Sequence, residues 1–215
     1  MIKHILGTFT LVLLLNACTS TSVQTLPIYG EREPVTKTVN GQEVTDTVYH
    51  TIPVFSFVNQ YGDSITDKSL DGKIYVADFF FTSCPSICPI MHRNMLKVYN
   101  TYKDNDDFKI VSYSIDPKYD TVAVLKKYAA GLNITGNTWW LLTGDKEATY
   151  TLSKSYLVTT PKEDGKEKFI HDGYFLLIDK QKRIRGTYDG TDEKQVAQLV
   201  EDIKTLRADP EQAVK

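Results

Sequence analysis

The chain has 215 residues, of which 41% are hydrophobic and 24% are charged, and its formal net charge is −2. These values are typical of one compact globular domain with short extensions, and they exclude a largely disordered or fibrous protein. The mildly acidic balance, without a cluster of Lys and Arg among aromatic residues, also argues against nucleic acid as a partner.

The first 18 residues have the pattern of an export signal. A lysine near the start is followed by an apolar run over residues 5–15, and the small residue Ala17 precedes Cys18. The run is shorter than the roughly 20 apolar residues that span a bilayer. Leu15-Asn16-Ala17-Cys18 resembles a bacterial lipobox, whose cysteine is acylated and becomes the first residue of the mature protein. We therefore expect a signal peptide at 1–17 and a lipid on Cys18 that holds the domain to a membrane of the bacterial cell envelope, outside the cytoplasm. An ordinary secretory signal or an uncleaved anchor is the alternative.

Residues 18–50 are expected to be a tether between membrane and domain. They are rich in Thr, Val, Pro and charged side chains and show no sustained helical or strand period. Within this segment, Asn40-Gly41 separates two short β-prone runs and predicts a hairpin turn. We expect the domain itself over residues 51–208, followed by a C-terminal tail at 209–215.

Strands and helices alternate through the domain. Strands are predicted at 54–58, 73–81, 108–115 and 139–142, and helices from Pro89, at 121–130 and at 145–155. Asp120 is the predicted cap of the second helix and Gly131 its stop.

The chain closes with a strand pair and a helix. The strands are predicted at 174–178 and 184–188 and the helix at 192–206. Residues 73–81 are almost continuously apolar, which is typical of a central strand covered on both faces. The pattern predicts an α/β domain with a central mixed sheet flanked by helices, preceded by an N-terminal extension.

Two cysteines follow directly on this apolar strand, in the segment Thr82-Ser-Cys84-Pro-Ser-Ile-Cys88-Pro89. Because proline lacks an N–H group, Pro89 fits the first helical position with Cys88 as the cap. The positive end of a helix favours an anion, so we expect the Cys88 thiolate to form more readily than at the ordinary pKa of about 8.5. Paired thiolates suit Cu(I), Zn or an iron–sulfur cluster, but only Cys18 remains, so a four-cysteine site within one mature chain is excluded.

A third metal ligand must therefore be another residue type, and histidine is the candidate. The mature chain offers His50, His92 and His171. His171 stands just before the predicted strand 174–178, which we expect to lie beside the cysteine strand, and Asp172 is a candidate to orient its ring. His92 follows Cys88 by four residues and could reach the site, but we expect a solvated histidine on the helix surface.

Other notable side chains near the cysteines are expected to be structural. Met91 and Met95 share a helical face with Cys88, and core packing is favoured over metal binding. Asp78 stands in an apolar strand, so it either finds hydrogen-bond partners or lies near the site as a charge or proton partner. Asp116-Pro117 and Asp120 are expected to shape a turn and a helix cap.

Three segments in this order resemble the Sco/SenC family of copper-binding proteins. They are residues 83–89 with both cysteines, residues 112–117 followed by Asp120-Thr121, and His171 ahead of residues 175–179. The resemblance runs from about residue 52 to residue 206 and implies a thioredoxin-like fold. It also implies that Cys84, Cys88 and His171 are copper ligands.

The same resemblance implies a function and a partner. Members of the Sco/SenC family are tied to maturation of the copper A centre of cytochrome c oxidase, so the subunit that carries this centre is the expected partner. Two thiolates favour Cu(I) as the bound form, with Cu(II) as the alternative. Our first hypothesis is therefore a copper-binding metallochaperone rather than an enzyme.

The cysteine pair also permits a second function, thiol–disulfide exchange with Cys84 and Cys88 as the redox-active residues. The substrates would be cysteines of the oxidase subunit or of other exported proteins. Redox-active thioredoxins space their cysteines two residues apart and carry a cis-proline ahead of the corresponding strand. Here the spacing is three, and the nearest proline before Tyr174 is Pro161. These differences favour metal binding over disulfide exchange.

Overall fold

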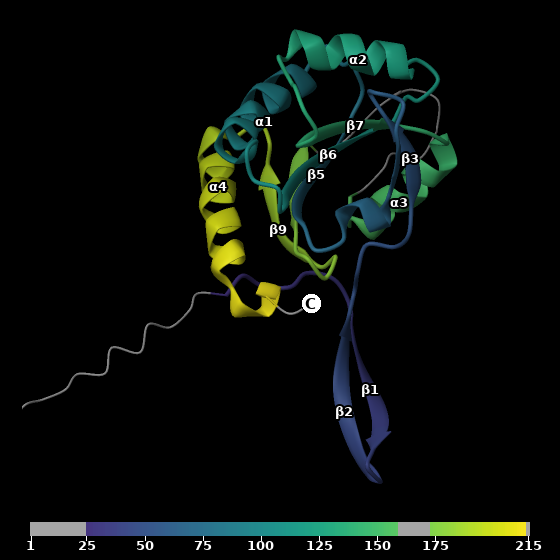
Figure 1. Ribbon diagram of the computed structural model, residues 1–215, viewed down its shortest axis with the longest axis vertical. Coiled ribbons are helices and arrows are strands. Elements are labelled where there is room, and N and C mark those ends of the chain that lie inside the picture. The colour runs from purple at the N-terminus through teal and green to yellow at the C-terminus, as the bar shows by residue number, and fades with distance from the viewer. Residues whose placement is uncertain (1–24, 159–172, 214–215) are drawn as a thin grey trace, which may run out of the picture.

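A seven-stranded mixed sheet forms the centre of the computed structural model, which describes residues 25–158 and 173–213 (Figure 1). The strand order is β4-β3-β7-β6-β5-β8-β9. The central strands β5, β6 and β7 are parallel, and the other neighbours pair antiparallel. The predicted α/β class with a central mixed sheet is confirmed. The strands are β3 (Ser56–Asn59), β4 (Ser64–Thr66), β5 (Ile74–Phe80), β6 (Phe108–Ser114), β7 (Trp139–Thr143), β8 (Tyr174–Ile178) and β9 (Ile184–Asp189).

Helices cover both faces of this sheet. Helices α1 (Cys88–Tyr102), α2 (Val122–Gly131) and α4 (Glu193–Ala208) share one face, where His92 of α1 bonds to Tyr128 of α2 and Tyr102 of α1 bonds to the backbone of α4. Helix α3 (Lys146–Ser155) lies across the sheet from α1 and α4 (Figure 1). Two 3-10 turns, η1 (Asp67–Leu70) and η2 (Pro210–Ala213), complete the domain.

The strand that leads to the cysteines is buried along its whole length, as its apolar sequence predicts. Alternate residues of a strand point to opposite faces, so Asp78 faces α1 while Tyr75 faces the α3 side. There the hydroxyl of Tyr156 lies 3.0 Å from that of Tyr75 and 3.1 Å from that of Tyr113. The cysteine strand is therefore fixed from both sides.

The predicted hairpin is present as β1 (Arg32–Val39) and β2 (Gln42–Tyr49). Asn40 and Gly41 have φ angles of 52° and 80°, the left-handed conformation that a two-residue type I′ turn requires. The hairpin is exposed along both strands and projects from the domain (Figure 1).

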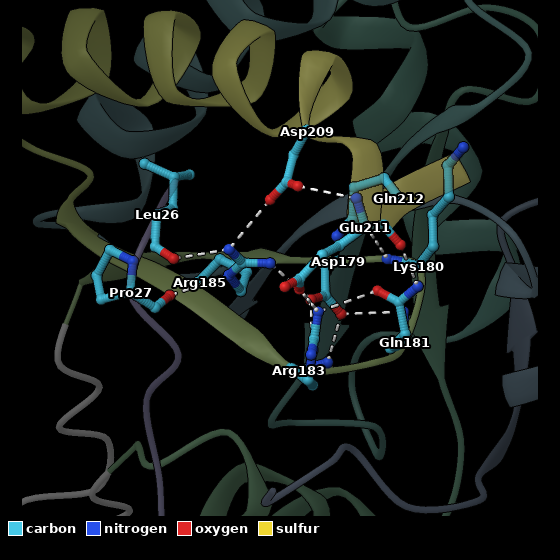
Figure 2. Close-up of polar contacts among 10 residues, drawn as sticks. All are labelled: Leu26, Pro27, Asp179, Lys180, Gln181, Arg183, Arg185, Asp209, Glu211 and Gln212. Carbon is cyan, nitrogen blue, oxygen red and sulfur yellow. Dashed lines mark hydrogen bonds and ion pairs between the residues drawn. The ribbon is translucent and has the colours of Figure 1, made fainter. Parts of the chain in front are cut away.

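A buried arginine joins the start of the described chain to the domain. The Arg185 guanidinium donates to the backbone oxygens of Leu26 and Pro27 at 2.6 and 3.0 Å and bonds to Asp179 at 3.0 Å (Figure 2). Nη2, the nitrogen that donates to Leu26, also lies 3.5 Å from Asp209. Part of the segment expected as a tether is thus bound to the domain, and so is Asp209, at the start of the expected tail.

The hairpin and the cysteines lie at opposite ends of the sheet. The Ile52 amide donates to the Lys182 oxygen just beyond β8, and the end of β8 pairs with the start of β5, where Ile178 faces Tyr75. The cysteines follow the far end of β5. Across residues 25–158 and 173–213, no helix is long and apolar enough to cross a membrane.

Candidate metal centre

Cys84 and Cys88 lie in the connection between β5 and α1, at the carboxyl end of the central strand. Both are thiols, and their exposed fractions are 7% and 1%. The Cys84 amide donates to the Phe81 oxygen at 3.2 Å, and its Sγ lies 3.7 Å from Ser86 Oγ. The connection is therefore a tight, ordered loop that holds both sulfurs below the surface.

Helix α1 begins one residue earlier than the sequence predicted. Ile87 is the N-cap and Cys88 the first helical residue, which moves Pro89 to the second position. Proline is tolerated there as well, because the amides of the first turn have no acceptor within the helix. The prediction that Cys88 caps the helix is wrong.

The prediction of a readily formed Cys88 thiolate is also wrong. Burial raises the pKa of the Cys88 thiol far above its ordinary value, and the neighbouring Cys84 thiol and Asp78 carboxylate act in the same direction. A hydrogen bond with the Phe81 backbone lowers the pKa of Cys88, but the effect of burial is larger. Removing the Cys88 thiolate from water costs more free energy than the helix end contributes, so Cys88 is protonated in the metal-free site.

Asp120 holds the cysteine loop instead of capping α2. Its carboxylate accepts hydrogen bonds from the amide and the hydroxyl of Thr82, and from the hydroxyl of Ser114 at 2.5 Å. Thr121 is the cap of α2, with its hydroxyl accepting from the Val124 amide. The predicted Asp120 cap is wrong because these inward donors satisfy its buried carboxylate. The predicted turn is confirmed, since the amide of Asp120 donates to the Asp116 oxygen.

The polar residues beneath the cysteines form one buried network. Asp78 accepts from Ser112 at 2.5 Å and lies 3.3 Å from Nε2 of His92, whose Nδ1 is 2.9 Å from the Tyr128 hydroxyl. Trp139 donates to Ser112. Asp78 thus has the hydrogen-bond partners that its sequence position required. One available sequence clue was the pair Ser112 and Ser114, which alternate with apolar residues in a buried strand and donate to Asp78 and Asp120.

His92 is fully buried, so the expectation of a solvated helix histidine is wrong. The helix turns this residue toward the sheet, where Asp78 and Tyr128 satisfy both ring nitrogens. Met91 and Met95 are 1% and 0% exposed within the hydrophobic core, which confirms their predicted packing role.

The third predicted ligand, His171, lies outside the described residues, as do Cys18 and Asp172. Strand β8, which follows His171, pairs with β5 as predicted. Gly173 lies against the cysteine loop, since a Cβ atom there would be 3.2 Å from Cδ1 of Ile87. His50 is at the opposite end of the sheet and bonds to the Ser155 oxygen at 2.6 Å. The described residues alone contain no cluster of three His, Cys, Asp or Glu side chains suited to a metal.

Comparison with known proteins identifies the family. A family model described as SCO1/SenC matches residues 43–208, which include both cysteines and His171. The chain belongs to the SCO1/SenC family. The match begins within β2 and ends with α4, so the whole sheet of this SCO1/SenC protein is covered.

Three solved structures place this SCO1/SenC fold among characterised relatives. A SCO1/SenC family lipoprotein from Bacillus anthracis is 32% identical, with a TM-score of 0.66 over 73% of this chain and 95% of that one. BsSco, described as a cytochrome c oxidase assembly protein with a disulfide switch, is 30% identical, with a TM-score of 0.66 over 77% and 95%. ScoI of Bradyrhizobium japonicum, solved with copper bound, is 28% identical, with a TM-score of 0.57 over 70% and 98%. The thioredoxin-like Sco fold that the family resemblance implied is confirmed.

Proposed function

We propose that this SCO1/SenC protein is a copper metallochaperone that delivers copper to the copper A centre of cytochrome c oxidase. The observation that carries the proposal is the position of Cys84 and Cys88, two thiols held together in the loop between β5 and α1. Soft sulfur ligands favour Cu(I). The copper-bound relative ScoI and the oxidase assembly role given for BsSco support copper as the cargo and the oxidase as its destination.

His171 is proposed as the third ligand. The strand that follows it in the sequence, β8, lies beside the cysteine strand, and Gly173, two positions later, packs against Ile87 in the cysteine loop. Imidazole, like thiolate, is a common copper ligand in proteins. With Cys84 and Cys88, His171 would complete a three-coordinate site.

Copper binding must displace protons from this site. Burial raises the pKa of the Cys88 thiol, so the metal-free protein carries protonated sulfur, whereas the bound ligand is a thiolate. Copper affinity should therefore rise with pH until Cys88 is ionised. Oxidation of the pair to a disulfide would remove two ligands, so the redox state of the cysteines would control loading.

The domain is proposed to stay at a membrane of the bacterial cell envelope through a lipid on Cys18. The support is the lipobox pattern ahead of Cys18 and the similarity to a Bacillus anthracis protein described as a lipoprotein. The lipid would place the domain on the side of the membrane where exported proteins fold and where thiols can be oxidised. Substituting Cys18 by serine should release the protein from the membrane fraction.

The copper proposal is tested by titrating the reduced protein with Cu(I) against a competing chelator. Cys84→Ser, Cys88→Ser and His171→Ala should each lower the copper affinity by at least tenfold, which corresponds to about 1.4 kcal/mol. Ser83→Ala, in the same loop, and His50→Ala, at the other end of the sheet, are matched controls and should bind as the wild type does. An unchanged affinity in Cys84→Ser and His171→Ala would refute the ligand assignment.

A second candidate function is thiol–disulfide exchange, favoured by the two adjacent thiols and by the disulfide switch named for BsSco. In that reaction one thiolate attacks a disulfide of the target to form a mixed disulfide, and the second thiol resolves it. The target gains a dithiol while Cys84 and Cys88 become a disulfide. Incubation of the reduced protein with an oxidised copper A domain, followed by thiol counting on both proteins, tests this function. An unreduced target would exclude the exchange with that domain.

A further inference from the structure

The burial of the two sulfurs restricts how copper can leave the protein. Cys84 and Cys88 are only 7% and 1% exposed. A ligand on a second protein can reach an ion held between them only if that protein contacts the surface around the loop. Pro85 and Ser86 form the exposed outside of this loop and would lie within the contact.

Three large apolar side chains are exposed beside this loop, each from a different element. Ile90 in the first turn of α1 is 42% exposed, Tyr119 in the turn after β6 is 57% exposed, and Tyr174 at the start of β8 is 42% exposed. We call these three residues the apolar rim. Exposed aromatic and aliphatic side chains that gather around one point are the usual anchors of a protein interface.

Contacts within the domain fix the apolar rim next to the cysteines. Ile90 is two residues after Cys88. Tyr119 precedes Asp120, which bonds to Thr82 two residues before Cys84. These bonds tie the turn that carries Tyr119 to the cysteine loop.

Tyr174 is held next to the cysteine loop by contacts of β8 and of the residue before it. It follows Gly173, whose backbone packs against Ile87, the residue before Cys88. The pairing of β8 with β5 then holds the Tyr174 backbone at the cysteine end of the sheet. Ile90 and Tyr174 thus belong to a helix and a strand, and Tyr119 lies in a turn that Asp120 bonds to the cysteine loop. Binding of a partner therefore requires little additional ordering of the backbone.

We propose that Ile90, Tyr119 and Tyr174 are the docking surface for a copper-accepting protein domain that carries a reduced pair of cysteines. The inference rests on the proposed function, because the acceptor is identified by the chemistry of the cargo. A thiolate pair is the acceptor chemistry that Cu(I) prefers. The apolar rim seats the acceptor around the loop while the acceptor sulfurs approach the ion.

Docking is tested without copper, by calorimetric titration of the reduced full-length chain with a reduced, copper-free copper A domain. Ile90→Ser, Tyr119→Ser and Tyr174→Ser should each weaken the complex by about tenfold, because each removes an exposed anchor. Tyr61→Ser is the matched control, since Tyr61 is also 42% exposed but bonds to Gly136 at the opposite end of the sheet. Its affinity for the acceptor should equal that of the wild type.

A second measurement needs no variant. Backbone amide signals of Ile90, Tyr119 and Tyr174 should shift in NMR spectra of the wild-type chain when the acceptor domain is added, while that of Tyr61 stays in place. Unchanged affinity in all three rim variants, or shifts centred elsewhere, would overturn the docking surface. Copper affinity of the rim variants, measured with the chelator, should match the wild type. A wild-type chain that binds the acceptor but not copper would refute the metallochaperone proposal and leave the docking surface supported.

Discussion

Asp78 Oδ2 lies 3.3 Å from His92 Nε2, and both side chains are completely buried beneath the cysteine loop. The second oxygen of Asp78 accepts from Ser112, and the second nitrogen of His92 meets the Tyr128 hydroxyl. With its proton on Nε2, His92 donates to Asp78 and accepts from Tyr128, so every member of the chain is satisfied. A buried carboxylate with these partners ties β5, α1 and α2 together.

Asp78→Asn is expected to lower the free energy of unfolding by about 1–3 kcal/mol. The amide keeps the size of the side chain but replaces an oxygen acceptor by an NH₂ group, so one buried donor is left without its partner. Urea unfolding measures the loss. Asp106→Asn, on an exposed loop, is the control and should change stability by less than about 0.5 kcal/mol.

Coupling between the two residues is measured by adding His92→Phe and the double variant. Because Asp78 and His92 share one hydrogen bond, the loss of unfolding free energy in the double variant should differ from the sum of the two single losses by about 0.5–3 kcal/mol. Strict additivity would show that the network carries no coupling between β5 and α1.

Asp120→Asn is expected to loosen the cysteine loop. Its carboxylate accepts from Thr82 and Ser114, and an asparagine can serve fewer of these donors. We expect a loss of about 1–3 kcal/mol in unfolding free energy and faster alkylation of Cys84 by iodoacetamide. Asp106→Asn again serves as the control, and an alkylation rate equal to that of the wild type would contradict a role for Asp120 in holding the loop.

Gly173→Ala is expected to destabilise the protein by about 1–2 kcal/mol. Gly173 has a φ of +66°, which an L side chain adopts at a cost, and its Cβ would come within 3.2 Å of Ile87. Gly131→Ala is the matched control, because it lies in α2 with no atom within 4 Å of the added Cβ. There the change should stabilise the protein by about 0.5–1 kcal/mol. In thermal unfolding, the Tm should fall for Gly173→Ala and rise for Gly131→Ala.

The raised pKa of Cys88 predicts a loss of stability at alkaline pH. Below the ordinary thiol pKa of about 8.5, both the folded and the unfolded states carry the proton and stability is complete. As the pH rises above that value the unfolded state ionises first, because burial keeps the folded thiol protonated. Stability should start to fall as the pH rises above about 8.5 and should keep falling at higher pH, because the folded-state pKa lies far above that value. Cys88→Ala should make this fall shallower. If the unfolding free energy of Cys88→Ala fell with pH as steeply as that of the wild type, the raised pKa of Cys88 would be contradicted.

Sequence patterns identified most elements of this fold because they depend on local chemistry. The apolar run of residues 73–81 defined the central strand, and Asn40-Gly41 defined the hairpin turn, since few other residues tolerate its left-handed backbone. The cysteine spacing and the flanking prolines located the candidate site between a strand and a helix. All of these signals come from neighbours in the chain.

Tertiary contacts decided the properties that the sequence predicted wrongly. A helix end suggested an acidic Cys88, but the depth of the loop below the surface, set by the surrounding elements, raises its pKa instead. The helix position of His92 is compatible with either a solvated or a buried side chain. His92 is buried because its side of α1 packs against Asp78. Local pattern fixes which residues can form an element, whereas burial and long-range partners fix the protonation and the role of each side chain, because both depend on atoms far apart in sequence.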